Sequence, residues 1–276
     1  GGRGETGHKG ITYNPYGKER TRIVGGSSSG SASGVASGYV PFAVGSDTGD
    51  SIRKPASFAG LVGFKPTWGE ISRFGLFAFM PTLDHVGFFT RSVSEARVLF
   101  EKTRGYDKKD ATSVMNVPFK TEKDATLKGK KVAVLEPIFA LMKNKLLIKE
   151  FHNLVDKLRQ AGAVVDFVPF DKDLLAAIFP TYFILSCAEA NVSNACLTGI
   201  GFGNKEEGAS YEEIVANTRG KGFSSRIKYR LMLGQYALKK ENRNEYYDRA
   251  QKARRLIVEA VDKVLENYDV IMLPAA

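Results

Sequence analysis

The sequence contains little cysteine and little histidine. Its only cysteines are Cys187 and Cys196, and its only histidines are His8, His85 and His152. Two cysteines are too few for the disulfide framework of a secreted domain, and no CxxC or Cys/His spacing typical of a zinc site is present. We therefore expect a protein of the reducing cytoplasm that binds no metal.

The sequence also lacks any run of about 18 consecutive apolar residues, the length that a membrane-spanning helix needs. Residues 1–9 are polar and glycine-rich, unlike the charged and then apolar start of an export signal. The sequence alone thus predicts no membrane association. With 276 residues and 43% apolar content the chain can bury a sizeable core, and we expect a single domain over residues 1–276.

Positive charge is abundant but uneven. The formal net charge is +10, and residues 217–263 hold 13 Lys or Arg against 5 Asp or Glu, an excess of 8. One interpretation is a solvated helix face that meets an acidic partner, and the other is a surface lying near nucleic acid. No aromatic-interleaved recognition motif accompanies the basic residues, so both interpretations stay open.

Residues 25–38 read GGSSSGSASGVASG, the composition of a flexible linker. Their context argues against a linker, because residues 25–44 carry no charge and an apolar stretch follows directly. Small residues of this kind allow close backbone approach in a buried segment. We predict a helix over residues 31–39, a strand over 40–45 and a tight turn from Asp47 to Ser51.

A strand–helix–strand pattern begins at Lys131. Strands are predicted at residues 131–135 and 164–168, with an amphipathic helix over 148–161 between them, which indicates an α/β fold. Residues 182–265 have mostly helical periodicity. The final apolar run, residues 268–274, predicts a buried strand, and since a core strand is an unusual terminus we expect the chain to be a piece of a longer one.

A serine nucleophile usually needs a histidine base within hydrogen-bond reach. The three histidines are isolated from one another in the sequence, and each is interpreted as a surface or packing residue. Residues 26–30, GSSSG, match the nucleophile-elbow pattern of α/β-hydrolases, but no strong strand precedes them and a serine-rich run matches easily. A histidine-based triad is therefore not favoured.

Longer motifs are more specific. GGSSSGSA at residues 25–32 is followed by GSDTGDSIRKPASFAGLVGFKPT at 45–67, then by SRFGL, LDHVG and FTR, and YRLMLG occurs at 229–234. This series resembles the amidase signature family, most closely the A subunits of glutamyl-tRNA(Gln) amidotransferases. The resemblance covers nearly the whole chain and implies an α/β amidase-signature fold with a central mixed β-sheet surrounded by helices.

The resemblance also implies a catalytic centre. Ser51 matches the family nucleophile and Ser27 the bridging serine, which family members hold on a cis peptide bond. A neutral lysine takes the nucleophile's proton through that serine, and its motif lies upstream of this sequence. The backbone N–H groups of Thr48, Gly49, Asp50 and Ser51 match the oxyanion hole, although Asp50 replaces a second glycine of the commonest pattern.

Other positions match residues around that centre. Asp47 and Arg53 are expected to orient the turn, with a purely structural ion pair as the alternative. Arg230 and Tyr182 match the residues that bind glutamine, Arg230 through the α-carboxylate. The acidic residue for the α-amino group lies in the family's C-terminal part, beyond Ala276.

The implied reaction is glutamine hydrolysis through an ester on Ser51. In the family the released ammonia passes to the B subunit of a heterotrimer, where ATP and Mg²⁺ are used to amidate Glu-tRNA(Gln), and the small C subunit braces the other two. The A subunit itself needs no cofactor and meets tRNA only through the complex. Two alternatives remain, namely a stand-alone amidase acting on another amide and a non-catalytic scaffold protein of the complex.

Overall fold

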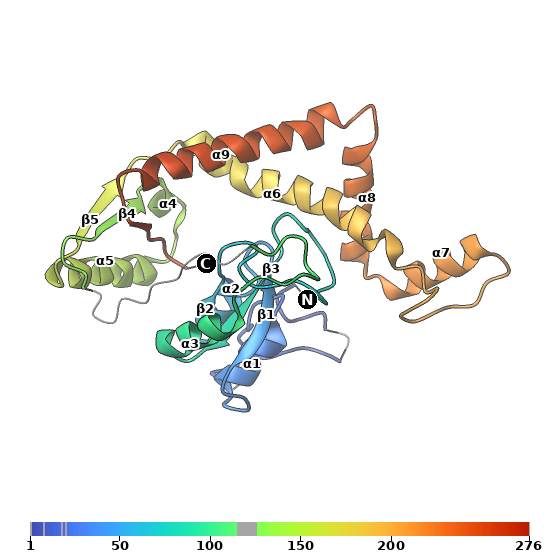
Figure 1. The fold of residues 1–276 in the computed structure, drawn as a ribbon, viewed down its shortest axis with the longest axis horizontal. Coiled ribbons are helices and arrows are strands. Elements are labelled where there is room, and N and C mark those ends of the chain that lie inside the picture. Colours follow the sequence, from blue (N-terminus) through green and yellow to red (C-terminus); the bar gives the residue numbers. More distant parts are fainter. Residues whose placement is uncertain (1, 8, 18, 20, 115–125, 276) are drawn as a thin grey trace. The chain divides into compact units, whose positions relative to one another are not determined.

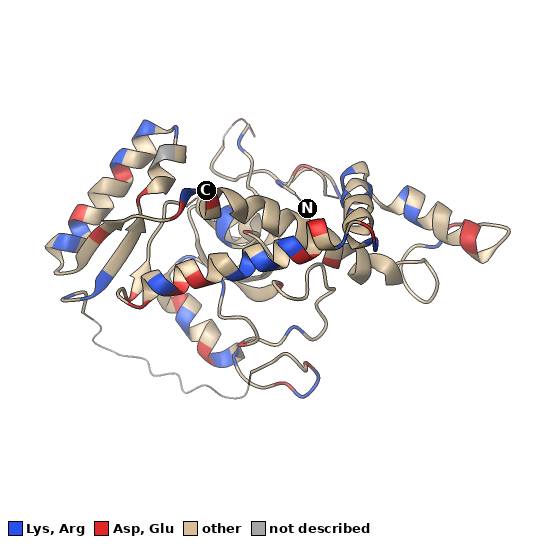
Figure 2. Cartoon of the chain, turned by 90° about the horizontal axis from the view of Figure 1, so that it is seen from above, with Lys and Arg blue, Asp and Glu red and all other residues tan. Residues whose placement is uncertain are grey.

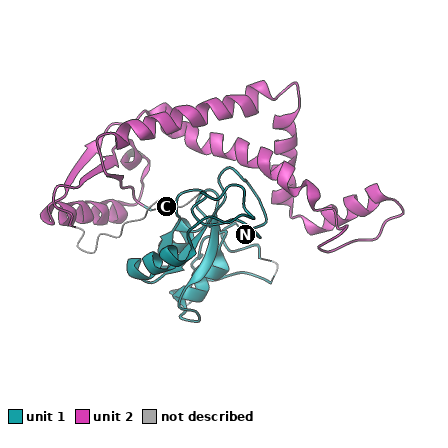
Figure 3. Ribbon diagram, in the orientation of Figure 1, with its two compact units in different colours: residues 1–119, 275–276 teal, residues 120–274 magenta. Residues whose placement is uncertain are grey.

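The computed structural model describes residues 2–7, 9–17, 19, 21–114 and 126–275. The chain forms two compact units, Gly1–Phe119 with Ala275–Ala276, and Lys120–Pro274 (Figure 3). We call them unit 1 and unit 2 and describe each by itself. That residues 1–276 form a single domain stays a prediction.

Unit 1 is built around a small sheet with helices from the adjoining segments (Figure 1). Its described elements are α1 (Ser29–Ala36), β1 (Ala43–Asp47), α2 (Arg53–Phe58), β2 (Val62–Phe64), β3 (His85–Thr90) and α3 (Val93–Thr103). The helix α3 has a complete capping box, in which the Ser92 side chain accepts from the N–H of Glu95 and the Glu95 side chain accepts from the N–H of Ser92.

The unit 1 sheet is antiparallel, with the order β1-β3-β2. Gly45 of β1 stands opposite Gly87 of β3. A Cβ at Gly87 would meet the Phe64 carbonyl oxygen at 2.1 Å, and one at Gly45 would meet Phe89 at 2.7 Å. Glycine is therefore required at both positions for the close packing of this sheet.

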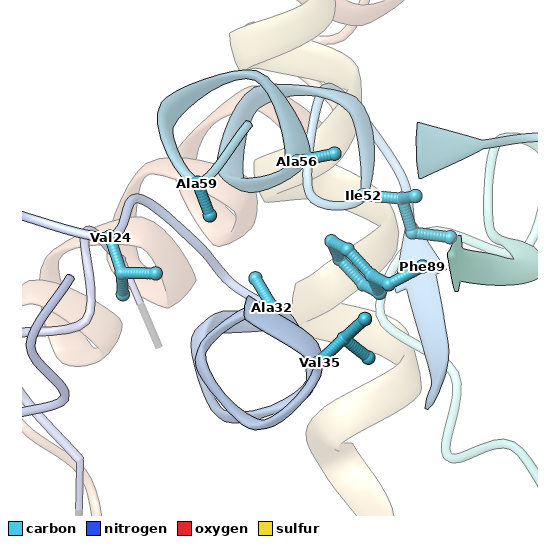
Figure 4. Packing of buried hydrophobic residues seen from close by; sticks show 7 residues of the cluster. All are labelled: Val24, Ala32, Val35, Ile52, Ala56, Ala59 and Phe89. Carbon is cyan, nitrogen blue, oxygen red and sulfur yellow. The ribbon is translucent and has the colours of Figure 1, made fainter. Parts of the chain in front are cut away.

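The core of unit 1 confirms that the glycine–serine segment is folded and is not a linker. Small side chains of α1 pack with residues of α2 and β3 (Figure 4). The buried cluster consists of Val24, Ala32, Val35, Ile52, Ala56, Ala59 and Phe89. Serines of α1 bond neighbouring backbone, since Ser31 Oγ donates to the Val44 carbonyl at 2.8 Å.

Element bounds in this region differ slightly from the sequence-based prediction. The helix α1 spans Ser29–Ala36, whereas residues 31–39 were predicted. It ends before Gly38, which has a φ of +79°. The strand begins at Ala43, three residues later than predicted, because Pro41 has no N–H to donate to a ladder.

Unit 2 combines a second sheet with long helices (Figure 1). Its described elements are β4 (Lys131–Leu135), α4 (Pro137–Leu141), α5 (Lys145–Gln160), β5 (Val164–Val168), α6 (Lys172–Ser193), the 3₁₀ turn η1 (Asn194–Cys196), α7 (Tyr211–Gly222), α8 (Ser225–Leu238), the π-helical turn η2 (Asn244–Asp248), α9 (Arg249–Leu265) and β6 (Val270–Ile271).

The predicted strand–helix–strand unit is present as β4, α5 and β5, and the α/β fold class is confirmed. The strands of the described ranges are divided between an antiparallel sheet in unit 1 and a parallel sheet, order β5-β4-β6, in unit 2. The prediction of a buried C-terminal strand was wrong. The strand β6 has two residues, pairs with β4 at the edge of the sheet formed by the described residues, and leaves Val270 49% exposed.

Helix α6 is long and apolar enough to cross a membrane by length and composition, the one such helix in the described part of the chain. Its buried residues include Leu185, Cys187 and Ala190, and α8 and α9 pack along it. The core helix of a soluble protein passes the same test of length and composition.

The basic segment of residues 217–263 falls in α7, α8, η2 and α9. Figure 2 shows Lys and Arg interspersed with Asp and Glu along the helices of this segment. In α9, Arg255 pairs with Glu259 at 2.7 Å, one turn later. This mixture of charges favours the solvated face over a continuous basic surface.

Candidate active site

Ser51 lies where a strand ends and a helix begins. The strand β1 ends at Asp47, residues 48–52 turn, and α2 starts at Arg53. Ile52 is fully buried in the core of unit 1, while Ser51 itself is only partly buried. The turn is thereby anchored by the residue after Ser51, and the serine remains accessible.

The glycine–serine segment is bonded to this turn. The Gly26–Ser27 peptide bond is cis, as the family resemblance implied. The Ser28 N–H donates to the Ser51 carbonyl at 3.3 Å. The Ser28 hydroxyl donates to the Ser46 carbonyl at 3.1 Å and accepts from the Ser46 N–H at 3.2 Å. These bonds join the glycine–serine segment to the segment that carries Ser51. Ser27, the residue before Ser28, is exposed.

Asp47 supports the turn from within the protein. Its fully buried carboxylate accepts from the N–H groups of Ile52 at 2.9 Å and Arg53 at 3.3 Å. The Arg53 guanidinium makes a two-pronged contact with the same carboxylate, at 3.1 and 3.0 Å. Burial alone would raise the pKa of Asp47, but the contacts with Arg53 and the two N–H groups outweigh it and lower the pKa below 3.8.

The four N–H groups predicted for the oxyanion hole are free to bind a ligand. In the part of the chain that the structure describes, no hydrogen bond is made by the N–H of Thr48, Gly49, Asp50 or Ser51. The turn is held through other atoms. The Thr48 hydroxyl donates to the Asp84 carboxylate, and the Arg53 guanidinium donates to the Gly49 carbonyl. Consecutive free N–H groups beside a serine are able to stabilise an oxyanion.

The carboxylate of Asp50, the departure from the family pattern, has a partner. Lys54 Nζ lies 2.5 Å from Asp50 Oδ2, and the Lys54 N–H donates to the Asp50 carbonyl at 2.9 Å. The Asp50 carboxylate is therefore held by a residue in the first turn of α2.

Two residues near the turn, Lys65 and His85, were given no role on sequence grounds. His85 is buried on β3, opposite Asp47, and its Nε2 lies 3.2 Å from Lys65 Nζ. Its Nδ1 lies 2.5 Å from the Leu83 carbonyl, so the ring donates there and accepts from Lys65. Both residues lie within motifs that carry the family resemblance, Lys65 in FKPT and His85 in LDHVG. Their place in these motifs was the only feature of the sequence that could have pointed to them.

The environment lowers the pKa of both groups. Burial lowers the pKa of Lys65 below 10.5, and repulsion from Arg53 adds to this effect. Burial and then the Lys65 charge lower the pKa of His85 below 6.5. His85 is thus a neutral packing residue at neutral pH, in agreement with its interpretation from the sequence. His152 packs between Phe139 and Phe167, and His8 lies outside the described residues.

Acidification is expected to destabilise unit 1 through His85. Because its folded pKa is lowered, the unfolded chain binds the proton more tightly, so this contribution to stability is present above pH 6.5 and lost as pH falls through the lowered pKa. His85→Gln removes the titrating group. Urea denaturation at about pH 7.5 and about pH 5 should show a smaller decrease in the free energy of unfolding for the variant. Equal decreases would contradict the assignment.

Arg230 and Tyr182 belong to unit 2, on the packed helices α8 and α6. The Arg230 guanidinium lies over the Phe183 ring at 4.9 Å and 3.5 Å from the Ser186 hydroxyl. No carboxylate pairs with Arg230 among the residues that the structure describes. It is therefore able to bind an external carboxylate. Tyr182 is partly buried on α6, beside Phe183 in the sequence.

No group of three or more His, Cys, Asp or Glu residues suited to a metal ion occurs within the described ranges. The chemistry that the turn can carry out is nucleophilic attack by a serine on a carbonyl carbon, with backbone N–H groups receiving the negative charge.

Comparison with known proteins agrees with this chemistry. The sequence model of the Amidase family matches residues 1–276. The chain is 40% identical over 279 residues to the A subunit of glutamyl-tRNA(Gln) amidotransferase from Staphylococcus haemolyticus, covering 100% of this chain and 57% of that protein. It is 41% identical to the protein of the same name from Macrococcus caseolyticus, over 96% of this chain and 55% of that one.

Solved structures give the same result for the fold. The A subunit of glutamyl-tRNA(Gln) amidotransferase from Thermotoga maritima matches with a TM-score of 0.70 and 35% identity, over 91% of this chain and 50% of that chain. A crystal structure of an amidase matches with a TM-score of 0.74 and 27% identity, over 98% of this chain and 52% of that chain. The chain thus spans little more than half the length of these relatives. Because the family model matches every residue, the chain belongs to the amidase family.

Proposed function

We propose that this chain forms part of a glutaminase, the A subunit of a glutamyl-tRNA(Gln) amidotransferase. The observation that carries the proposal is the turn at Ser51, where four consecutive N–H groups make no bond within the described residues and the Ser28 N–H of the glycine–serine segment donates to the Ser51 carbonyl. The similarity to A subunits supports glutamine as the substrate.

In the proposed reaction, Ser51 Oγ attacks the side-chain carboxamide carbon of glutamine. The N–H groups of residues 48–51 bind the oxygen that becomes negative, and the C–N bond then breaks to release ammonia and leave a γ-glutamyl ester. Water hydrolyses the ester to glutamate. The proton of Ser51 passes through Ser27 to a lysine that the family resemblance places upstream of this sequence, and it is then delivered to the leaving nitrogen, which departs as ammonia.

The proposal extends to the assembly. The ammonia passes to the B subunit of the complex, where ATP and Mg²⁺ are used to amidate Glu-tRNA(Gln), and the C subunit belongs to the same heterotrimer. Contact with tRNA is indirect, and the complex is cytoplasmic. The similarity to A subunits supports these partners, while the cytoplasmic location rests on the scarcity of cysteine.

Arg230 supplies the test of the substrate. An arginine with no carboxylate partner among the described residues matches a two-pronged contact with the α-carboxylate of glutamine. In the complete protein, Arg230→Met should weaken glutamine binding by about 1.5–3 kcal/mol, which is roughly a 10- to 150-fold rise in KM with kcat less affected. Steady-state ammonia release from glutamine and from a panel of neutral amides measures this effect.

The matched control is Arg226→Met, an exposed arginine one turn earlier on the same helix, which should leave KM unchanged. Preference for a neutral amide would indicate a stand-alone amidase. An unaltered KM for glutamine in folded Arg230→Met protein would place the carboxylate contact elsewhere.

A further inference from the structure

Two carboxylates belong to the turn that carries Ser51. Asp47 precedes the free N–H groups and Asp50 lies among them, directly before the nucleophile. Each carboxylate has its own cation from the start of α2, since Arg53 pairs with Asp47 at 3.0 Å and Lys54 pairs with Asp50 at 2.5 Å. The first pair is built on a fully buried carboxylate, whereas Asp50 remains 49% exposed.

An unpaired carboxylate at position 50 would oppose the chemistry in two ways. Its negative charge would lie next to the oxygen that becomes negative during attack by Ser51. Aspartate side chains also accept readily from backbone N–H groups close by in sequence, so the carboxylate would compete for the oxyanion-binding donors. The second effect is not seen, because no N–H of residues 48–51 donates to the Asp50 carboxylate within the described part of unit 1.

Lys54 is placed to prevent both effects. The Lys54 side chain is the less exposed of the two, with 23% accessible against 49% for Asp50. The Lys54 N–H also donates to the Asp50 carbonyl at 2.9 Å, which fixes the lysine one helical turn after the aspartate. The side chain reaches back from α2 to Asp50 Oδ2.

We propose that Lys54 is a positioning residue that holds the Asp50 carboxylate on the α2 side of the turn and cancels its charge, leaving the oxyanion-binding N–H groups free. This inference rests on the proposed role of the turn in acyl transfer. It explains how the chain accommodates aspartate where the commonest family pattern has glycine.

The test is a double-mutant cycle in the complete protein, using Lys54→Met, Asp50→Gly and both together. Lys54→Met should slow single-turnover acylation by glutamine about 10- to 100-fold, less than the loss of a whole oxyanion-hole donor, with KM little changed. In the Asp50→Gly background the same substitution should change the rate by less than about threefold. Lys54→Arg should retain most of the rate.

Two control variants distinguish an effect of Lys54 on the Asp50 carboxylate from a general loss of protein stability. Arg255→Met breaks a similar i,i+4 pair, with Glu259 at 2.7 Å on α9, and should leave acylation unchanged. Asp50→Asn in the Lys54→Met background removes the charge without adding the backbone freedom of glycine, and it should restore the rate if the carboxylate is what inhibits. Melting temperatures of all variants are measured alongside.

A second probe distinguishes this inference from the glutaminase assignment. The rate at which a fluorophosphonate modifies Ser51 depends on the same turn but on no glutamine pocket. If the modification rate falls in Lys54→Met and recovers in the double mutant while no variant hydrolyses glutamine, Lys54 has the proposed role and the enzyme acts on a different substrate. If Lys54→Met acylates at the wild-type rate, or if removing the Asp50 carboxylate fails to restore the rate, the inference is overturned.

Discussion

Ser51→Ala is expected to abolish amide hydrolysis by the complete protein, with a loss on the order of 10⁶-fold in kcat, as in a serine hydrolase that loses its nucleophile. The physical reason is that the acyl-enzyme has no other attachment point at this turn. Ser28 is committed to the Ser46 backbone through both functions of its hydroxyl, and Ser27 is expected to relay the proton. The measurement combines ammonia release with mass spectrometry of protein trapped by a glutamine analogue.

Ser27→Ala is the informative comparison. It retains the nucleophile, so covalent trapping should still be detected, although more slowly, because the substitution interrupts proton transfer and leaves substrate binding intact. Recovery of the label on a peptide that contains Ser27 or Ser28 would refute the assignment of Ser51.

Asp47→Ala should unfold unit 1 more readily than any other single substitution in the turn. Removing the buried carboxylate leaves the N–H groups of Ile52 and Arg53 without an acceptor, and the Arg53 guanidinium loses its ion-pair partner. The Arg53 side chain is 50% exposed, so the ion pair itself contributes little and the cost lies mainly in the N–H groups. We expect a loss of about 2–3 kcal/mol in the free energy of unfolding.

Urea denaturation of the wild type and the variant measures this loss. Asp248→Ala is the matched control, because it removes the carboxylate of a more exposed pair with Arg243 at 3.4 Å and should cost at most about 1 kcal/mol. The stabilising effect of Asp47 should also disappear in acid, because its lowered pKa means that stability present above pH 3.8 is lost as pH falls through the folded value. A loss in Asp47→Ala no larger than that of the control would show that the turn is held by other contacts.

Much of the local structure could be predicted because its causes are contiguous in sequence. The strands β4 and β5 lie at the predicted residues, since runs such as Val132–Leu135 alternate with an amphipathic helix. The helix α5 begins three residues earlier than expected because Asn144 caps it, its side chain accepting from the N–H groups of Leu146 and Leu147. The family motifs likewise placed Ser27 on a cis peptide bond.

The surroundings of the turn could not be predicted in the same way. The contact of Thr48 with Asp84 spans 36 positions, and that of Lys65 with His85 spans 20. Both depend on the antiparallel register that sets Asp47 opposite His85. A register between strands is decided by the packing of a whole sheet face, and no single segment encodes it.

The sequence by itself therefore determined the family, the α/β class, the strand–helix–strand unit of residues 131–168 and the serine at the turn, because motif spacing and hydrophobic periodicity are properties of neighbouring residues. Only the tertiary structure decided that Asp47 is fully buried and which further groups support that turn, namely the Asp84 contact, the Lys65–His85 pair and the cation opposite Asp50. Burial and charge pairing arise when distant segments close on one another, and these contacts determine the protonation and orientation of the groups around Ser51.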